Sequence, residues 1–226
     1  MDILFGGFRD WALGVYAALV KDWPMELVGD PEKFAAAIGQ RRYDSVILAG
    51  WSWIVPKTIV ESMEVVGIHP SDLPNYAGGS PIQNQILDGV RNSAVTLFRL
   101  TPVLDLGPVI YKEPISLEGH LSQVFDEIER ASVIVLRWYL QNWPNVPAQA
   151  QPRERPPSRR RLTPAASRLT AEKIAALTCR QLWDFIRCRE DPYPNAFFED
   201  ETGRLVIRQV EFEPAADKET SEPPSK

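Results

Sequence analysis

Short apolar runs alternate with helical patterns along the first part of the chain, and this alternation limits the fold more than any other feature. The first run (DILF, 2–5) ends at Gly6-Gly7, after which apolar residues recur at helical spacing. Similar runs follow at 25–28, 44–49 and 65–68, separated by helical patterns at 31–42 and 56–63. Strands that alternate with helices pair in parallel through right-handed crossovers. We therefore predict an α/β fold with a Rossmann-like, mostly parallel sheet flanked by helices.

The remaining patterns divide the chain into one large domain and a small C-terminal extension. Ser80 and Pro81 are typical of a helix start, and the next predicted elements are a helix, two strands and a long amphipathic helix at 80–87, 94–100, 108–115 and 121–140. Thr178 and Gln181 match a capping box that begins a further helix, which a β-hairpin follows at 197–212. We predict a large domain at 1–143, a proline-rich linker at 144–170, a small helix and β-hairpin subdomain at 171–213, and a disordered tail at 214–226.

The composition argues against several classes of protein. The 226 residues carry a formal net charge of −5, which argues against a nucleic-acid surface. No apolar run of about 18 residues is present and the N-terminus lacks a basic region, so we expect no membrane span, no secretory signal and a cytoplasmic location. Two histidines and two cysteines, Cys179 and Cys188, are too few for a His/Cys metal site or a disulfide framework, so no metal is expected.

His69 and Asp105 are the candidates for chemistry. His69 directly follows the predicted strand 65–68, and Asp105 lies in the turn VLDLG between two predicted strands. In open parallel sheets, ligands bind outside the carboxyl ends of the strands, so His69 is expected at that rim. A histidine beside a carboxylate suits general acid/base catalysis. The alternative is a structural histidine that caps a loop beside a turn-forming aspartate.

Two separated motifs resemble the folate-dependent formyltransferases, the family of glycinamide ribonucleotide, methionyl-tRNA and sugar N-formyltransferases. The stretch HPSDLPNYAGGSPIQNQI, which begins at His69, is similar to the family signature, and Asp105-Leu106-Gly107-Pro108 matches the family's downstream turn at the family's distance. The stretch AGWSWIVPKTIV resembles the loop and helix that wrap the pterin. The resemblance spans about 1–140, and IRCREDPYPNAFFEDETG is similar to the start of the C-terminal extension in the methionyl-tRNA and sugar branches.

The resemblance implies transfer of a formyl group from the co-substrate N10-formyltetrahydrofolate to an amine. His69 would stabilise the tetrahedral oxyanion and take part in proton transfer, and Asp105 would position a water or carry the proton to the leaving nitrogen. The residues expected to bind the folate are Trp51, Ser52, Trp53, Ile54, Val55, Leu104 and Asp105. Those expected to face the acceptor are Arg9, Asp10, Asn75, Tyr76 and Gln83. For the two tryptophans, a position in the hydrophobic core is the alternative.

The sequence departs from the family pattern at a position that bears on the rate. Gly67 stands where the family has an asparagine, two residues before the histidine, so one side-chain contact to the oxyanion is missing. Loss of such a donor lowers a rate by about 10²–10³-fold. A backbone amide, Ser52 or Asn75 could substitute; otherwise the enzyme is slow, or the domain binds folate without turnover. Asp72 in place of Leu and Ala77 in place of Arg are smaller departures.

The short, acidic extension favours a small-molecule acceptor. A tRNA substrate would favour a larger, basic C-terminal domain. The family's purine-biosynthesis enzymes lack the Pro-Tyr-Pro extension found at 192–194. We therefore predict a nucleotide-linked amino sugar as the acceptor, with a small amine or an aminoacyl group as the alternative. A folate-binding domain without turnover, and hydrolysis of the formyl group to formate, are the competing functions.

Two features late in the chain have two interpretations each. The basic cluster RERPPSRRR (153–161) is interpreted as solvated linker, with contact to a phosphate-bearing ligand as the alternative. The apolar side chains of Trp138, Trp143, Trp183 and Phe185 either pack internally or form a homodimer interface.

Overall fold

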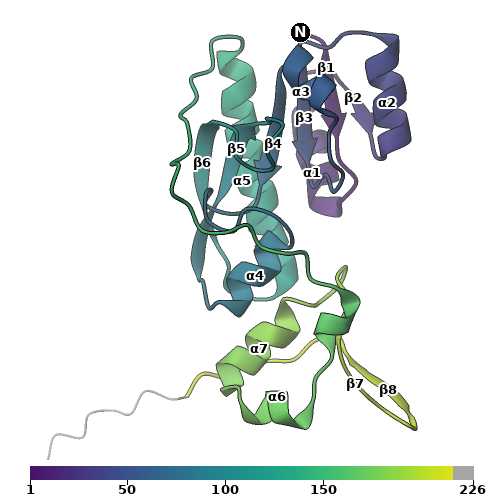
Figure 1. Cartoon of the computed structure of the whole chain (residues 1–226), viewed down its shortest axis with the longest axis vertical. Helices are drawn as coiled ribbons and strands as arrows, with labels where there is room; N and C mark the ends of the chain where they lie inside the picture. Colours follow the sequence, from purple (N-terminus) through teal and green to yellow (C-terminus); the bar gives the residue numbers. More distant parts are fainter. Residues whose placement is uncertain (216–226) are drawn as a thin grey trace, which may run out of the picture.

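A six-stranded sheet forms the centre of the larger lobe (Figure 1), in a computed structural model that describes residues 1–215. The strand order is β2-β1-β3-β4-β5-β6. β1 to β4 pair in parallel, whereas β5 and β6 are antiparallel to their preceding neighbours. The bounds are β1 (Ile3–Gly6), β2 (Met25–Val28), β3 (Ser45–Ala49), β4 (Val65–His69), β5 (Asn92–Arg99) and β6 (Val109–Ser116). The predicted fold class is confirmed, while the predicted tail lies outside the described residues from 216 onward.

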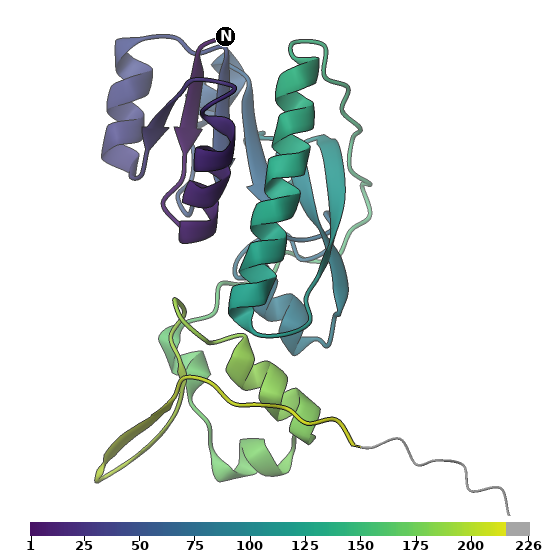
Figure 2. The ribbon, with the colours of Figure 1, turned by 180° about the vertical axis from the view of Figure 1, so that it is seen from behind.

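Helices cover both faces of the parallel strands, because successive strand residues point into two different hydrophobic cores. Ile3 and Phe5 of β1 pack with α1 and α5, whereas Leu4 packs with α2. Figure 2 shows α1 and α5 side by side over one face of the sheet. The bounds are α1 (Asp10–Leu19), α2 (Pro31–Gln40), α3 (Lys57–Ser62), α4 (Pro81–Leu87) and α5 (Leu121–Asn142). None of the helices among the described residues has the length and apolarity that a membrane crossing requires.

The smaller lobe is built from short elements: η1 (Pro164–Ser167), α6 (Ala171–Ala175), α7 (Cys179–Arg187), β7 (Ala196–Asp200) and β8 (Gly203–Ile207). The predicted capping box begins α7, since the Thr178 hydroxyl accepts from the Gln181 amide at 3.2 Å and the Gln181 side chain accepts from the Thr178 amide at 2.9 Å. The predicted hairpin is present but ends earlier than 212. The sequence patterns do not predict η1 and α6, which are each a single short turn of helix.

The segment that joins the lobes lies against the larger lobe instead of running free through solvent (Figure 1). Gln149 pairs with Val109 of β6 through two backbone hydrogen bonds of 2.7 and 2.8 Å. Ten residues later, Arg159 forms backbone hydrogen bonds with Ala77 and Gly79. Most residues of the basic cluster are exposed, as the interpretation of a solvated linker expects, but the backbone of Arg159 is fixed to the loop before α4.

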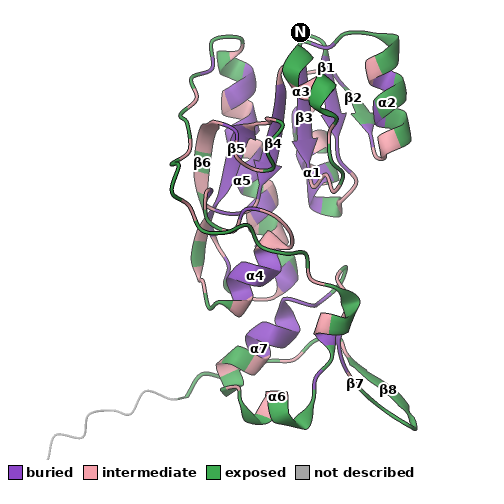
Figure 3. Ribbon diagram, viewed as in Figure 1, coloured by how far each residue is buried: buried purple, intermediate pink, exposed green. Residues whose placement is uncertain are grey.

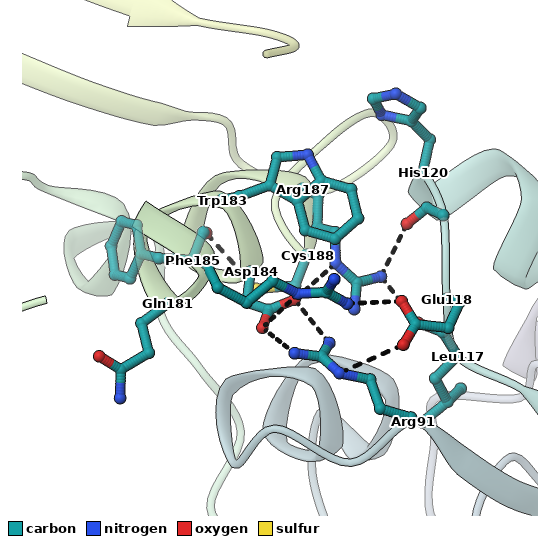
Figure 4. A network of polar contacts seen from close by, with 12 residues as sticks. Arg91, Leu117, Glu118, His120, Gln181, Trp183, Asp184, Phe185, Arg187 and Cys188 are labelled. Carbon is teal, nitrogen blue, oxygen red and sulfur yellow. Dashed lines mark hydrogen bonds and ion pairs between the residues drawn. The ribbon is translucent and has the colours of Figure 1, made fainter. Parts of the chain in front are cut away.

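A buried ionic network holds the smaller lobe against the larger one (Figure 4). Arg91, just before β5, donates to both carboxylate oxygens of Asp184 in α7, at 2.9 and 2.7 Å. Arg187 donates to the same carboxylate at 2.7 Å, and also to the carbonyls of Leu117 and Gly119 at 2.8 Å each. Burial opposes ionisation of Asp184, but the hydrogen bonds from the two arginines outweigh it and hold the pKa of the carboxyl below its usual value. The position of α7 therefore depends on this charge.

The four aromatic side chains that could have formed an association surface pack within the chain. Trp183 and Phe185 are buried in the smaller lobe, as Figure 3 shows for the α7 helix that carries them. The Trp183 ring nitrogen donates to the carbonyl of Val210 at 3.1 Å. Trp138 and Trp143 pack against the main core. The late aromatic residues thus account for internal packing.

Candidate active site

His69 lies at the carboxyl end of β4, where the parallel part of the sheet meets β5. The residue is 7% exposed. Its Nε2 is 3.0 Å from the carbonyl oxygen of Tyr76, and its Nδ1 is 3.7 Å from Oδ2 of Asp105. Because a carbonyl can only accept, Nε2 must carry the hydrogen, and Nδ1 of the neutral ring is then an open acceptor. Nδ1 of His69 faces the carboxylate across 3.7 Å, a gap wider than a hydrogen bond.

The turn between β5 and β6 brings Asp105 to this position. Asp105 has a φ of 51°, a left-handed conformation that Asp tolerates better than most residues. Gln151 of the linker fixes the turn by donating to the carbonyls of Asp105 and Gly107, at 2.9 and 2.8 Å. A Cβ on Gly107 would lie 1.6 Å from the carbonyl oxygen of Arg99, so only glycine fits. The DLGP motif thus places a carboxylate at a fixed point near His69.

The loop 76–79 connects the histidine, the aspartate and the linker through successive residues. Tyr76 holds His69 through its carbonyl, and the Gly78 amide donates to Asp105 Oδ2 at 2.8 Å. Between and after them, Ala77 and Gly79 form the backbone hydrogen bonds to the linker described above. A displacement of the linker would therefore be transmitted to both side chains of the candidate pair.

An apolar pocket of about 210 Å³ opens on the Asp105 side of the pair. Its walls come from the loop after β3, the loop after β5, and the floor of β4 at Gly67 and Ile68. Trp53, Ile54 and Leu104 are 41%, 90% and 62% exposed at its rim. Flat ring systems bind in such slots, because apolar walls cover both faces of the ring. Of the residues predicted to bind folate, this pocket is lined by Trp51, Trp53, Ile54, Val55, Leu104 and Asp105.

A more polar pocket of about 250 Å³ opens on the His69 side. Arg9 and Gln83, two of the residues predicted to face the acceptor, line it, and so does Ser52, which was predicted on the folate side. The remaining walls come from the linker and the smaller lobe, through Arg161, Leu162, Thr163, Ser167, Arg189, Tyr193 and Pro194. Trp51 and Ile68 border both pockets, so the two spaces adjoin at the His69–Asp105 pair.

Three predicted acceptor residues do not present side chains to this pocket. Asp10 is an exposed first residue of α1, and Asn75 is exposed on the loop. The Tyr76 hydroxyl donates to Asp88 at 3.1 Å, so Tyr76 reaches the site through its carbonyl only. The prediction missed the arginines of the linker and the smaller lobe. The one sequence signal for Arg161 was its place in the basic cluster, where ligand contact was the alternative interpretation.

Comparison with known proteins agrees with this geometry. A family model described as formyl transferase matches residues 24–131, which include β4, His69 and Asp105. The matched region, a little under half of the chain, is similar to the formyl transferase family. The chain is 28% identical over 174 residues to a methionyl-tRNA formyltransferase of Rickettsia rickettsii (strain Iowa), covering 75% of this chain and 55% of the relative. The chain thus spans about half the length of the curated relatives it matches.

Solved structures of formyl transferases and related proteins share the fold over nearly the whole chain. A methionyl-tRNA formyltransferase from Clostridium thermocellum superimposes with a TM-score of 0.80 at 21% identity, covering 94% of each chain. A sugar N-formyltransferase from Shewanella sp. gives 0.75 at 17% identity, covering 95% of this chain and 99% of the other. HypX from Aquifex aeolicus, solved in complex with tetrahydrofolic acid, gives 0.75 at 18% identity, covering 88% of this chain and 36% of the other. At these identities the likeness concerns the fold.

Gly67, where the resemblance leads us to expect an asparagine, borders the apolar pocket, and side chains of β5 and the loop after it lie close to it. A Cβ on Gly67 would lie 2.7 Å from Cδ1 of Leu100 and 3.1 Å from Cε1 of Phe98. The place of a side chain at position 67 is therefore filled by these two apolar side chains from β5 and its following loop. Of the substitutes proposed from the sequence, Ser52 lines the polar pocket beside His69, whereas Asn75 does not.

Proposed function

We propose that this protein moves a formyl group from N10-formyltetrahydrofolate to the amino group of a nucleotide-linked amino sugar. The observation that carries the proposal is the position of the His69–Asp105 pair between an apolar pocket and a polar one. A pair in this position would lie where the formyl group of the folate and the amine of the acceptor meet. The match of residues 24–131 to the formyl transferase family model supports the reaction class.

The apolar pocket is the proposed site of the folate. Trp51 and Trp53 would cover the pterin, and Ile54, Val55 and Leu104 would close the slot over it. Asp105, at the inner end of this pocket, is the only acidic residue among its lining residues. The residues present thus fit a flat, largely apolar ring with one polar edge directed to the catalytic pair.

His69 is the proposed proton acceptor for the amine. An amine that attacks the formyl carbon must lose a proton, and the open Nδ1 of His69 can accept it. The resulting imidazolium would be stabilised by the carboxylate of Asp105 on one side and by the Tyr76 carbonyl on the other. The same cation can stabilise the oxyanion and then return the proton to the leaving nitrogen. Asp105 would hold the ring in place.

Methionyl-tRNA is the competing acceptor, because the curated relative quoted above is a methionyl-tRNA formyltransferase. The net charge of −5 and the small volume of the polar pocket support a small acceptor instead. Gly67 supports a third possibility, in which the protein binds folate with little turnover. These alternatives differ in the products that they form.

The test is an incubation of the protein with N10-formyltetrahydrofolate and, separately, UDP- and dTDP-linked amino sugars, methionyl-tRNA and free amino acids. Mass spectrometry detects the formylated product, and absorbance measures release of tetrahydrofolate. We expect product from at least one sugar nucleotide and none from the variant His69→Ala. Product from methionyl-tRNA alone would overturn the sugar assignment. Folate binding without product from any acceptor would favour the binding domain, and release of formate without acceptor would indicate hydrolysis.

A further inference from the structure

We infer that Arg9, Arg161 and Arg189 together bind a diphosphate group of the acceptor in the polar pocket. This inference rests on the proposed function and deepens it, because it assigns the recognition of the acceptor to particular side chains. The three arginines come from three segments far apart in the sequence: the loop after β1, the linker, and the segment after α7. All three line the same pocket as His69.

The charge balance of the pocket is the first reason. No aspartate or glutamate is among its lining residues. Across residues 1–215, none of the three arginines has a carboxylate within the 4.0 Å ion-pair distance. By contrast, Arg91 and Arg187, which join the two lobes, are both paired with Asp184. Three arginines that line one pocket without a carboxylate partner make a candidate site for an anion.

The burial of Arg189 is the second reason. Arg189 is 3% exposed, and its guanidinium stacks 3.7 Å over the ring of Phe185. Its hydrogen bonds go to the carbonyls of Phe185 and Ala166 and to the sulfur of Cys188. Burial lowers the pKa of this guanidinium, because a charge in a poorly solvated place is unfavourable without a partner. A bound anion would supply that partner.

Arg9 is held over the pocket by a glycine and two aromatic rings. Gly50 has a φ of 61°, and a Cβ there would lie 2.8 Å from Cγ of Arg9. The guanidinium lies 4.9 Å from the ring of Phe8 and 5.8 Å from the ring of Tyr193. Contact with Tyr193 joins the loop after β1 to the smaller lobe. The side chain is thus fixed by packing that leaves its donors available to a ligand.

Arg161 reaches the pocket because two glycines let the linker approach. A Cβ on Gly79 would lie 2.4 Å from the Arg161 nitrogen and 2.5 Å from its Cα. Gly78 similarly leaves room for the backbone of Arg159. The Leu162 amide then donates to the Ser80 hydroxyl at 3.0 Å, which fixes the linker just beyond Arg161. Gly78-Gly79 and the three arginines at 159–161 therefore pack against each other, although they are far apart in the sequence.

A diphosphate fits these observations better than a single carboxylate. Planar guanidinium groups bind phosphate oxygens in pairs, and three of them match an anion with several oxygens. The volume of about 250 Å³ must hold both this anion and the amine beside His69, so both groups belong to one small molecule. Nucleotide-linked amino sugars have this combination of groups.

The first test is the binding of inorganic pyrophosphate, measured by isothermal titration calorimetry. Arg161→Gln and Arg9→Gln are each expected to weaken binding about tenfold or more, the effect of losing hydrogen bonds to a charged group. The matched control is Arg160→Gln, which removes the same charge from the neighbouring residue outside the pocket lining. Circular dichroism verifies that each variant is folded. Gly79→Ala should weaken binding as well, because it displaces the backbone of Arg161.

Equal losses in Arg160→Gln and Arg161→Gln would overturn the site, because the effect would then be one of net charge only. Absence of saturable binding to the wild type would overturn it too. Competition with pyrophosphate by a short RNA ending in CCA, but not by UDP or dTDP, would replace the sugar nucleotide by an RNA end.

The two proposals fail in different ways. Formyl transfer to an uncharged amine without pyrophosphate binding would leave the proposed reaction standing and remove the anion site. Arginine-dependent pyrophosphate binding without any formyl transfer would leave the anion site standing and remove the proposed reaction. If both hold, Arg161→Gln should raise the KM for the sugar nucleotide about tenfold or more with little change in kcat, because the anion lies away from the reacting atoms.

Discussion

Replacing Asp184 by asparagine should loosen the smaller lobe, since this carboxylate is the shared partner of two arginines from different parts of the chain. The Arg187 side chain is 0% exposed, and without Asp184 its charge would be left with carbonyl partners only. Removing one partner of a buried ion pair costs about 3–5 kcal/mol. Arg91 adds less, because its side chain is 28% exposed and keeps Glu118 at 3.3 Å. We therefore expect a loss of about 3–5 kcal/mol, a fall in Tm of about 6–20 °C for a chain of this size.

Calorimetric unfolding of wild type and Asp184→Asn measures this loss, and hydrogen exchange locates it. Amides of α7 should exchange faster, while those of β1 to β4 should be unaffected. The matched control is Asp191→Asn, whose side chain is 73% exposed beside Arg208, and whose effect should stay within about 0.5 kcal/mol. Asp184→Leu combined with Arg187→Met removes both buried charges and should be less destabilising than Asp184→Asn alone.

The effect of Asp184 also has a definite pH dependence. Its pKa is lowered in the folded state, so its contribution is present above the unfolded pKa and is lost as the pH falls through the folded value. The difference between wild type and Asp184→Asn should therefore shrink in acid. If Asp184→Asn is as stable as Asp191→Asn at neutral pH, the role given to this network is wrong.

Two further predictions concern single positions. The Glu190 carboxylate accepts a hydrogen bond from the His120 ring and, despite burial, raises the pKa of His120. The stabilisation is therefore present at low pH and is lost as the pH rises through the raised value. The free energy of unfolding in urea should fall by about 0.2–1 kcal/mol over that range in wild type but not in His120→Gln, and equal pH profiles would contradict this. Gly67→Asn alone should destabilise the protein by about 1–3 kcal/mol, because its Cβ meets Leu100 and Phe98. The double variant Gly67→Asn with Leu100→Ala should recover most of that loss. A Gly67→Asn protein as stable as wild type would show that the space beside position 67 is open.

The sequence predicted the large lobe well because its strands and helices follow from local patterns. Each apolar run that ends at glycine formed a strand, and the alternation of the two cores within β1 repeats the two-residue period of the strand. The position of His69 followed from the same pattern, because the carboxyl end of a parallel strand is fixed once the strand is known. Local periodicity thus carried both the fold class and the place of the histidine.

The parts that the sequence did not predict depend on contacts between distant segments. Ser80 is at the start of α4 as predicted, but its hydroxyl accepts from Leu162 of the linker and does not cap the helix. Arg161 is exposed, as expected for a solvated run, but nothing in its own neighbourhood indicates that its backbone packs against Gly79. The composition of the linker could not predict its position, because that position is set by contacts with the distant loop 76–79.

The rate of formyl transfer in His69→Asn tests the central claim most directly, namely that the imidazole between the two pockets carries the proton from the amine. Single-turnover transfer from N10-formyltetrahydrofolate should slow by about 10²–10⁴-fold, the usual contribution of a general acid/base. Binding of the folate, measured in the same preparation, should stay within about twofold, since His69 is outside the lining of the apolar pocket. A His69→Asn protein that transfers the formyl group at a rate within about threefold of wild type would contradict the account.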